Sequence, residues 1–369
     1  MIQLDYKNDT INGTIIMKLK FNQLNKRQEA ILDLINKQGK ATVPKLFLIL
    51  SKKSFKTSKI TIIRDLNQLL KYNFIKRIGN GRSVIYQLSD QYNLLKPIDA
   101  DDYFKINPDI REAKKSFNFK LTNILKNIFI ADEEENLNQL ASKYQKNIAR
   151  LPQANFKREF ERLLIEFSWK SSAVEGNTYT LLETESLIKE NKQAKGHKKE
   201  EATMILNHKN ALEYIRNNVS DFKMITLRKL ENIHLILTKD LNIGRGIRKT
   251  PVGIIGTVYR PLDNIFQIKE ALEAACKLVN EEKNIFAKAI VLMIMIAYIQ
   301  PFEDGNKRTS RLAANAILMA NNICPLSYRS VSEDEYKKAV ILFYEQNNVS
   351  YFKKLFIEQF EFAVKNYFL

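Results

Sequence analysis

A polar loop between two uninterrupted apolar helices is the feature that most constrains how this chain folds. Residues 285–299 form a dense apolar run without Gly or Pro, and residues 309–321 are Ala-rich and equally unbroken, so both stretches predict helices. The loop between them reads QPFEDGNKR, residues 300–308. Amides at a helix start, a small glycine and several cations together favour a polyphosphate. We therefore expect nucleotide contacts from Gly305, Asn306, Lys307, Arg308 and Arg311.

An acidic side chain in the same loop indicates a metal. Asp304 stands where a hard divalent cation, Mg²⁺, can bridge a carboxylate and a phosphate. The simpler interpretation of the loop is a helix N-terminus with an acidic first turn and solvated cations. The length of the motif favours the phosphate-binding interpretation.

The loop closely resembles the signature of the Fic (Fido) family, H-P-F-x-[DE]-G-N-[GK]-R-x-x-R, and departs from it at the first position. The resemblance implies a protein that binds ATP and transfers AMP to a Ser, Thr or Tyr hydroxyl of a target protein. It places the catalytic positions at Gln300, Asp304, Asn306 and Arg308.

The first position of the signature decides how active such a protein is. The family has a His there that accepts the hydroxyl proton, whereas the carboxamide of Gln300 has no proton-accepting equilibrium near neutral pH. Loss of a general base typically removes about 10²- to 10⁴-fold in rate, so we expect weakened transfer. The chain has only His197, His208 and His234, and none of them offers an evident replacement.

A second motif, SSAVEGN at residues 171–177, resembles the inhibitory motif [ST]-x-x-x-E-[GN] of the same family. The resemblance implies that Ser171, Glu175 and Gly176 lie at a helix end beside the nucleotide loop. It also implies a salt bridge from Glu175 to Arg311 that keeps the γ-phosphate of ATP out of position, because carboxylate and phosphate compete for the same guanidinium donors. The alternative is a helix C-terminus with its glycine cap, and both descriptions can hold together.

Small and β-branched residues alternate between Gly and Pro at residues 251–261, which predicts a short β-hairpin. The family resemblance implies that this hairpin is a flap that docks the target by strand addition, through Val252, Ile254, Ile255 and Gly256. A purely structural hairpin would look similar. Tyr336 resembles in position a family tyrosine near the adenine, with a core or surface role as the alternative.

The first 90 residues predict a winged helix-turn-helix domain. Helical periodicity covers residues 27–36, residues 43–51 and, after the cap candidate Ser58, residues up to 70. Strand-like stretches at 74–78 and 83–88 flank a Gly-Asn-Gly turn. The segment holds about 17 lysines and arginines against about 6 acidic residues, roughly +11 of the total charge of +18.

Such a domain implies duplex DNA as a partner, because its third helix enters the major groove and its wing contacts phosphate. We expect groove contacts from Lys59, Thr61 and Arg64. Phosphate contacts are expected from Lys52, Lys53, Lys56 and Arg82. Winged helices also serve as protein-interaction or dimerisation modules, which is the alternative.

The 369 residues accommodate two domains. We assign residues 1–90 to the winged helix-turn-helix, 91–119 to a linker, and 120–369 to a mainly α-helical Fic domain with one β-hairpin. The longest apolar run, residues 289–299, is far shorter than the roughly 20 residues of a membrane span, so no membrane partner is expected. The absence of a secretion-signal pattern and of metal-type spacing at Cys276 and Cys324 predicts a cytoplasmic location. The sequence is also compatible with a homodimer.

Two functions fit these observations. One is an AMP-transferase for protein targets, restrained by Glu175 and weakened at Gln300. The other is a catalytically inactive, nucleotide-sensing transcriptional regulator, in which nucleotide occupancy changes DNA binding by the N-terminal domain.

Overall fold

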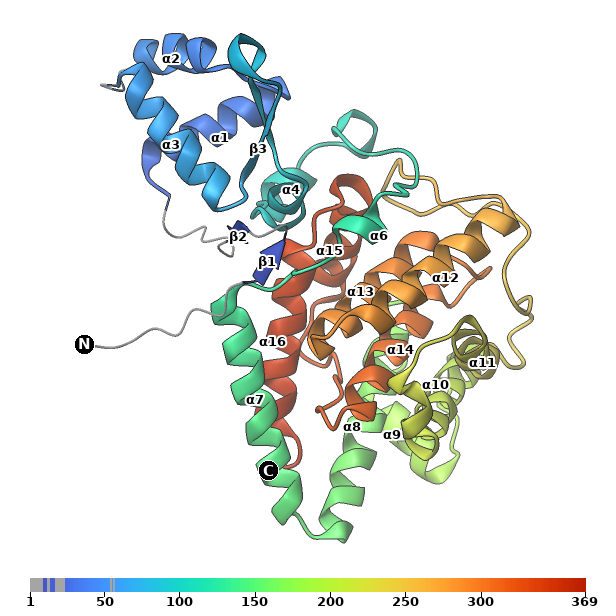
Figure 1. Cartoon of the computed structure of the whole chain (residues 1–369). Coiled ribbons are helices and arrows are strands. Elements are labelled where there is room, and N and C mark those ends of the chain that lie inside the picture. Colours follow the sequence, from blue (N-terminus) through green and yellow to red (C-terminus); the bar gives the residue numbers. More distant parts are fainter. Residues whose placement is uncertain (1–8, 12–13, 17–23, 54, 56) are drawn as a thin grey trace. The chain divides into compact units, whose positions relative to one another are not determined.

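The computed structural model describes residues 9–11, 14–16, 24–53, 55 and 57–369, so Lys56 lies outside the described residues. The chain divides into two compact units, Met1–Lys96 and Pro97–Leu369. Figure 1 shows the elements of both units.

The first unit contains the three helices and the hairpin that the sequence predicts, which confirms the winged helix-turn-helix. Buried Ile31, Ile35, Leu50, Ile62 and Leu66 join the helices in one core. Ser58 caps the third helix, because its side chain accepts the amide of Thr61. The elements are α1 Lys26–Gln38, α2 Val43–Lys52, α3 Lys59–Lys71, β3 Ile75–Ile78, β4 Ile85–Leu88 and α4 Asp90–Leu95, with a separate antiparallel pair, β1 Asp9–Ile11 and β2 Thr14–Ile16.

The wing is an antiparallel ladder in which Ile75 faces Leu88 and Ile78 faces Ile85. The second strand, expected from Ser83, begins two residues later at Ile85. A 3₁₀ turn, Gly81–Ser83, occupies the start of that stretch, and the Ser83 hydroxyl donates to the carbonyl of Asn80 at 2.8 Å. This local hydrogen bond holds the residue in the turn and out of the ladder.

The second unit is helical and is organised around one buried helix. Its elements are α5 Ala100–Phe104, α6 Leu121–Ile124, α7 Ala131–Arg150, α8 Gln153–Ala173, α9 Leu181–Glu190, α10 Lys199–Asn217, α11 Leu227–Leu237, α12 Ile265–Glu281, α13 Ile285–Ile299, α14 Asn306–Ala320, α15 Glu333–Gln346 and α16 Ser350–Asn366, with 3₁₀ turns at Pro108–Ile110 and Val219–Lys223. The apolar run predicted as a helix is α13, which packs against α12, α14 and α15 (Figure 1). Since α13 is apolar all round, it is enclosed by its neighbours, and its end presents the signature loop.

Residues 91–119, expected as a linker, divide between the two units. The stretch up to Leu95 belongs to α4, and the chain from Pro97 on is part of the second unit. The amide of Lys114 donates to the carbonyl of Glu345 at 2.8 Å, and the amide of Asn118 donates to the Tyr298 hydroxyl at 3.0 Å. These two hydrogen bonds attach the segment after Pro97 to the helices of the second unit.

The flap differs from the hairpin expected, because residues 251–261, all of them described, contain no β-strand. The segment has a turn at Ile255 and Gly256, and Gly256 has a φ of 86°. Two of its backbone groups bond outside the flap: Gly256 O accepts from Arg111 at 2.6 Å, and the Arg260 amide donates to Lys115 O at 3.0 Å. These two groups are therefore not available for pairing across the flap.

Within the part of the chain that the structure describes, none of the helices combines the length and the apolar character that crossing a bilayer requires.

Candidate functional site

A cavity of about 450 Å³ lies where three segments of the second unit meet. The segments are the end of α8 with Glu175, the flap, and the signature loop between α13 and α14, while α15 closes one side. The lining residues are Val174, Glu175, Gly176, Val252, Gly253, Ile254, Ile255, Gln300, Glu303, Asp304, Gly305, Asn306, Lys307, Lys337, Val340, Ile341 and Tyr344. The motifs that the sequence analysis singled out separately therefore share one cavity.

Two left-handed residues shape the signature loop. Gln300 ends α13 with a φ of 50°, and Gly305 precedes α14 with a φ of 76°. Asn306, the first residue of α14, braces the loop, because its side chain accepts the Phe302 amide at 2.9 Å and donates to the Phe302 carbonyl at 2.8 Å. The Asn306 side chain thus holds the loop backbone, and the helix start faces the cavity.

Glu175 forms two ion pairs with cations of the signature. One carboxylate oxygen lies 2.9 Å from Arg311 Nη2, and the other lies 2.8 Å from Lys307 Nζ. Burial by itself raises the pKa of Glu175, but the charges of Arg311 and Lys307 outweigh it and hold the pKa at about 2. The expected pair with Arg311 is present, and the pair with Lys307 adds a second bond that the sequence analysis missed.

Ser171 of the same motif also contacts Arg311, through both its hydroxyl and its carbonyl. The Ser171 hydroxyl lies 2.9 Å from Arg311 Nε, and its carbonyl accepts from Arg311 Nη2 at 2.7 Å. Gly176 has a φ of 95°, so the inhibitory motif is also a glycine-terminated helix end.

Arg308 is buried with most of its hydrogen-bonding capacity unused. Its Nη2 lies 3.2 Å from Asp304, while Nε and Nη1 of Arg308 and Nη1 of Arg311 have no hydrogen-bond partner among the described residues. Burial lowers the pKa of the Arg308 guanidinium. Buried N–H groups without acceptors are costly, so this pair of arginines fits an anion bearing several oxygens.

Gln300 lies at the cavity with its amide directed into the protein. Its Nε2 donates to the carbonyl of Ala297 at 2.6 Å and lies 3.4 Å from the hydroxyl of Tyr344. The carboxamide is thus held as a hydrogen-bond donor at the position where the family has a proton acceptor.

Asp304 is a possible ligand for a metal shared with a phosphate, and it stands alone in that role. One of its oxygens accepts the Gly305 amide at 2.6 Å and the other faces Arg308, while 68% of the side chain is exposed. No cluster of three or more metal-binding side chains occurs within the described ranges. A single carboxylate with phosphate oxygens and water is a usual set for Mg²⁺.

Tyr336, which was expected near the adenine, is not among the residues that line the cavity. Tyr336 is 2% exposed, and its ring lies 4.9 Å from the guanidinium carbon of Arg311. The cavity is instead lined by Tyr344, two turns further along α15. Tyr336 therefore packs on the guanidinium of Arg311.

The flap contributes three of its four expected residues to the cavity. Val252, Ile254 and Ile255 line it, and Ile255 is 97% exposed. Gly256 forms the turn that Arg111 holds.

Two buried arginines that the sequence analysis did not consider position the flap and the loop. Arg248 donates to the carbonyls of Gln300 at 2.6 Å and Thr250 at 2.7 Å, and also to that of Leu262. Arg111 lies 3.3 Å from the buried carboxylate of Glu345 on α15. Neither belongs to a motif, so no local signal in the sequence could have identified them.

One histidine does lie beside the loop. His234 stacks on Phe302 with ring centres 3.9 Å apart, and its Nε2 lies 3.0 Å from the carbonyl of Asp304. Burial lowers the pKa of His234 to about 4. The ring is therefore neutral, and its Nε2–H supports the loop.

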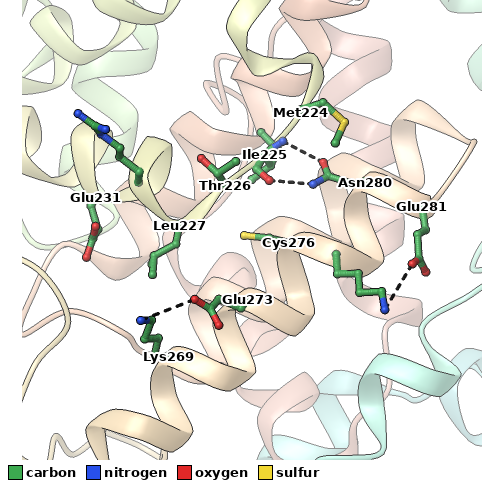
Figure 2. A pocket seen from close by; sticks show the side chains of 12 residues that line it. Met224, Ile225, Thr226, Leu227, Glu231, Lys269, Glu273, Cys276, Asn280 and Glu281 are labelled. Atoms are coloured by element: carbon green, nitrogen blue, oxygen red, sulfur yellow. Dashed lines mark hydrogen bonds and ion pairs between the residues drawn. The ribbon is translucent and has the colours of Figure 1, made fainter.

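A second pocket, of about 730 Å³, lies between α12 and the segment that leads into α11 (Figure 2). Asn280 bonds both backbone groups of Ile225 across it, at 2.8 and 2.9 Å. Burial raises the pKa of the Cys276 thiol to about 12, so the sulfur is uncharged. No residue of the signature loop is among those that line this pocket.

In the first unit, the residues expected to contact DNA differ in exposure. Lys59, Arg64 and Arg82 are exposed, while Thr61 is half-buried with its hydroxyl 3.0 Å from that of the cap residue Ser58. Lys52 and Lys53 are exposed at the end of α2.

Comparisons with known proteins agree with both units. Residues 224–318 match the Fic/DOC family, and residues 27–87 match the DeoR-like helix-turn-helix domain. The chain thus combines a helix-turn-helix domain with a larger helical domain. It carries a Fic/DOC domain preceded by a DeoR-like helix-turn-helix domain.

Relatives and solved structures support the same assignment. The protein adenylyltransferase Fic of Culex quinquefasciatus is 28% identical over 192 residues, which is 50% of this chain and 37% of that protein. The corresponding protein of Nematostella vectensis is 28% identical over 187 residues, 49% and 43% of the two chains. The chain therefore matches less than half the length of these relatives.

Two solved structures share the fold. Fic-1 of C. elegans has a TM-score of 0.57 at 18% identity, covering 64% of this chain and 72% of that one. A Fic-domain-containing signaling protein of Bacteroides thetaiotaomicron has a TM-score of 0.53 at 18% identity, covering 62% and 94%.

Proposed function

We propose that the second unit binds ATP with Mg²⁺ and is of the protein AMP-transferase type, with its phosphate site closed by Glu175 and its transfer step slowed at Gln300. The observation that carries this proposal is the double ion pair of Glu175. A single carboxylate engages Arg311 and Lys307, two of the cations that would otherwise face phosphate.

ATP binding is supported by the donors that surround the loop. The helix start at Gly305 and Asn306, the amine of Lys307 and the unpaired nitrogens of Arg308 provide sites for phosphate oxygens. Asp304 would hold Mg²⁺, which neutralises phosphate charge when bound. The exposed flap tip at Ile255 offers apolar surface for a target segment.

In the transfer step, the hydroxyl oxygen of a target Ser, Thr or Tyr bonds to the α-phosphorus while the bond to the bridging oxygen breaks and pyrophosphate leaves. The hydroxyl proton needs an acceptor, and the Gln300 amide is a donor to Ala297. Positioning and charge stabilisation alone leave a slow reaction.

The test is ATP affinity measured by calorimetry with Mg²⁺ on the full chain. We expect Glu175→Gln to bind ATP at least about 10-fold more tightly than the unaltered protein, because Arg311 and Lys307 are released. Glu133→Gln is the matched control, since Glu133 forms a comparable partly buried pair with Lys353 at 2.7 Å outside the cavity. Equal affinities for the unaltered and Glu175→Gln proteins would refute closure by Glu175.

A second candidate function follows from the helix-turn-helix domain in the same chain. In that function the first unit binds duplex DNA through α3 and the wing, and nucleotide in the second unit changes DNA affinity without transfer. The Glu175→Gln chain with and without saturating ATP tests it. A several-fold change in DNA affinity supports a sensor, whereas identical DNA affinities reject one.

The same proposal includes a cytoplasmic location. Cys276 and Cys324 are free thiols and both are buried, which suits a reducing compartment.

A further inference from the structure

The outer face of α3 carries large apolar side chains that the electrostatic account of DNA binding does not explain. Ile60 is 72% exposed and Ile63 is 43% exposed. Beta-branched residues are not favoured in exposed helix positions, where they neither pack nor improve helix propensity. A contact with another molecule would explain why isoleucines occupy these two exposed positions.

The outer face forms one stripe along the helix. Five exposed residues make up the stripe, and each lies three or four positions from another member of the set: Ile60, Ile63, Arg64, Asn67 and Lys71. The opposite face is buried and holds the domain core. The stripe is therefore the part of α3 that faces away from the core of the first unit.

The single acidic residue of α3 is turned away from this stripe. Asp65 is 4% exposed and bonds Arg27, with its oxygens 2.5 Å from Arg27 Nε and 3.2 Å from Nη2. The five-residue stripe thus presents two cations, two isoleucines and one carboxamide, and it contains no carboxylate. Three further exposed cations of the first unit add to this positive charge, which complements DNA phosphate: Lys52, Lys53 and Arg82.

Two of these side-chain types, isoleucine and asparagine, have partners on the base edges of A·T pairs. In the major groove the C5-methyl of thymine is the apolar group, adenine presents the N6 and N7 pair that Asn bonds, and a carboxylate is the usual partner of cytosine N4. The isoleucines of the stripe can contact thymine, Asn67 can bond adenine and Arg64 can bond guanine. The stripe contains no carboxylate to accept from cytosine N4.

We propose that α3 reads A·T base pairs in the major groove, with Ile60 and Ile63 contacting thymine methyl groups and Asn67 contacting adenine. This inference rests on the proposed binding of DNA by the first unit. It adds the base composition of the site and names two apolar residues as its readers.

The experiment removes the methyl groups from the DNA and leaves base pairing intact. Duplexes bound by the full-length protein are selected from a random library, and the best duplex is then prepared with deoxyuridine in place of thymidine. We expect the selected site to contain a run of A·T pairs and the deoxyuridine form to bind about 10-fold more weakly in fluorescence anisotropy, from the loss of two buried methyl contacts.

A double variant assigns the effect to the two isoleucines. Ile60→Ala with Ile63→Ala is expected to bind the thymidine duplex about 10-fold more weakly and to bind the two duplexes equally. The matched control is Leu48→Ala on α2, which removes a side chain that is 57% exposed and should retain the full preference for thymidine. Circular dichroism melting checks that each variant is folded, since all three positions are exposed.

The outcomes separate the two proposals. If no duplex is bound at low salt, DNA binding itself is rejected and the base preference with it. If DNA is bound but thymidine and deoxyuridine duplexes bind alike, or the double variant keeps the preference, only the base-reading proposal is overturned. If the double variant instead changes the sedimentation coefficient while the duplexes bind alike, the isoleucines contact protein and the inference is wrong.

Discussion

Glu175 Oε1 lies 2.9 Å from Arg311 Nη2, although the two residues are 136 positions apart in the chain. Arg311 is fully buried and the Glu175 side chain is 17% exposed, with its second carboxylate oxygen held by Lys307. A largely buried carboxylate with two cationic partners is a strong local interaction, and removal of one member leaves an uncompensated charge. The ion pairs of Glu175 therefore affect both the stability of the second unit and its affinity for anions.

The Glu175 ion pairs make part of the folding free energy depend on pH. The pKa of Glu175 is held at about 2, below the value of 4.5 for an unperturbed carboxyl. A lowered pKa contributes stability that is fully present above the unfolded value and is lost as the pH falls towards the folded one. Between about pH 7 and about pH 4 the unaltered protein should therefore lose about 1 kcal/mol of unfolding free energy that Glu175→Gln does not lose. Urea unfolding at both pH values measures this, and a parallel loss in the two proteins would contradict it.

Restoring a proton acceptor at residue 300 should restore transfer. Gln300→His is expected to raise AMP transfer from α-labelled ATP by about 10²- to 10⁴-fold, most clearly when combined with Glu175→Gln. Gln300→Ala serves as the control, since it removes the carboxamide without supplying a base. Strong labelling by the unaltered chain, or equal labelling by the His and Ala variants, would show that residue 300 does not limit the reaction.

Arg308 is predicted to favour binding at the expense of stability. Its guanidinium is buried with two unpaired nitrogens, and its partner Asp304 is largely exposed. Replacing such a group by an apolar side chain of similar size is often neutral or stabilising. We expect Arg308→Met to melt at or above the temperature of the unaltered protein and, in the Glu175→Gln background, to lose the ATP-induced rise in melting temperature. A fall of several degrees without ATP would mean that Arg308 is structural.

Arg111 and Glu345 should act as a unit that holds the flap. Arg111→Met leaves the buried Glu345 carboxylate without its cation, so a loss of about 3 kcal/mol is expected. Arg111→Met with Glu345→Met should recover part of that stability, while flap residues 252–256 exchange their amide hydrogens faster in both variants because Gly256 O has lost its donor. Unchanged exchange in the flap would show that Arg111 does not position it.

Local patterns in the sequence were sufficient for the helices and the turn of the winged domain and for the helices on either side of the signature loop. The apolar run of α13, the cap at Ser58 and the Gly-containing turn of the wing depend on residues within a few positions of one another. Helix N-termini and turns are determined by such short-range hydrogen bonds, so the winged domain and the loop opening α14 were predictable. The position of Glu175 beside Arg311 came from the resemblance to a known motif.

Only the tertiary structure decided which distant groups meet. Lys307 as a second partner of Glu175, Arg248 on the Gln300 carbonyl and Arg111 on the flap turn all join segments far apart in the chain. It also placed Tyr344 in the cavity, put Tyr336 against Arg311 and left the flap without a ladder. Sequence periodicity shows which face of an element is buried, but a buried ion pair or carbonyl contact depends on how whole helices pack, and that packing has no local signature.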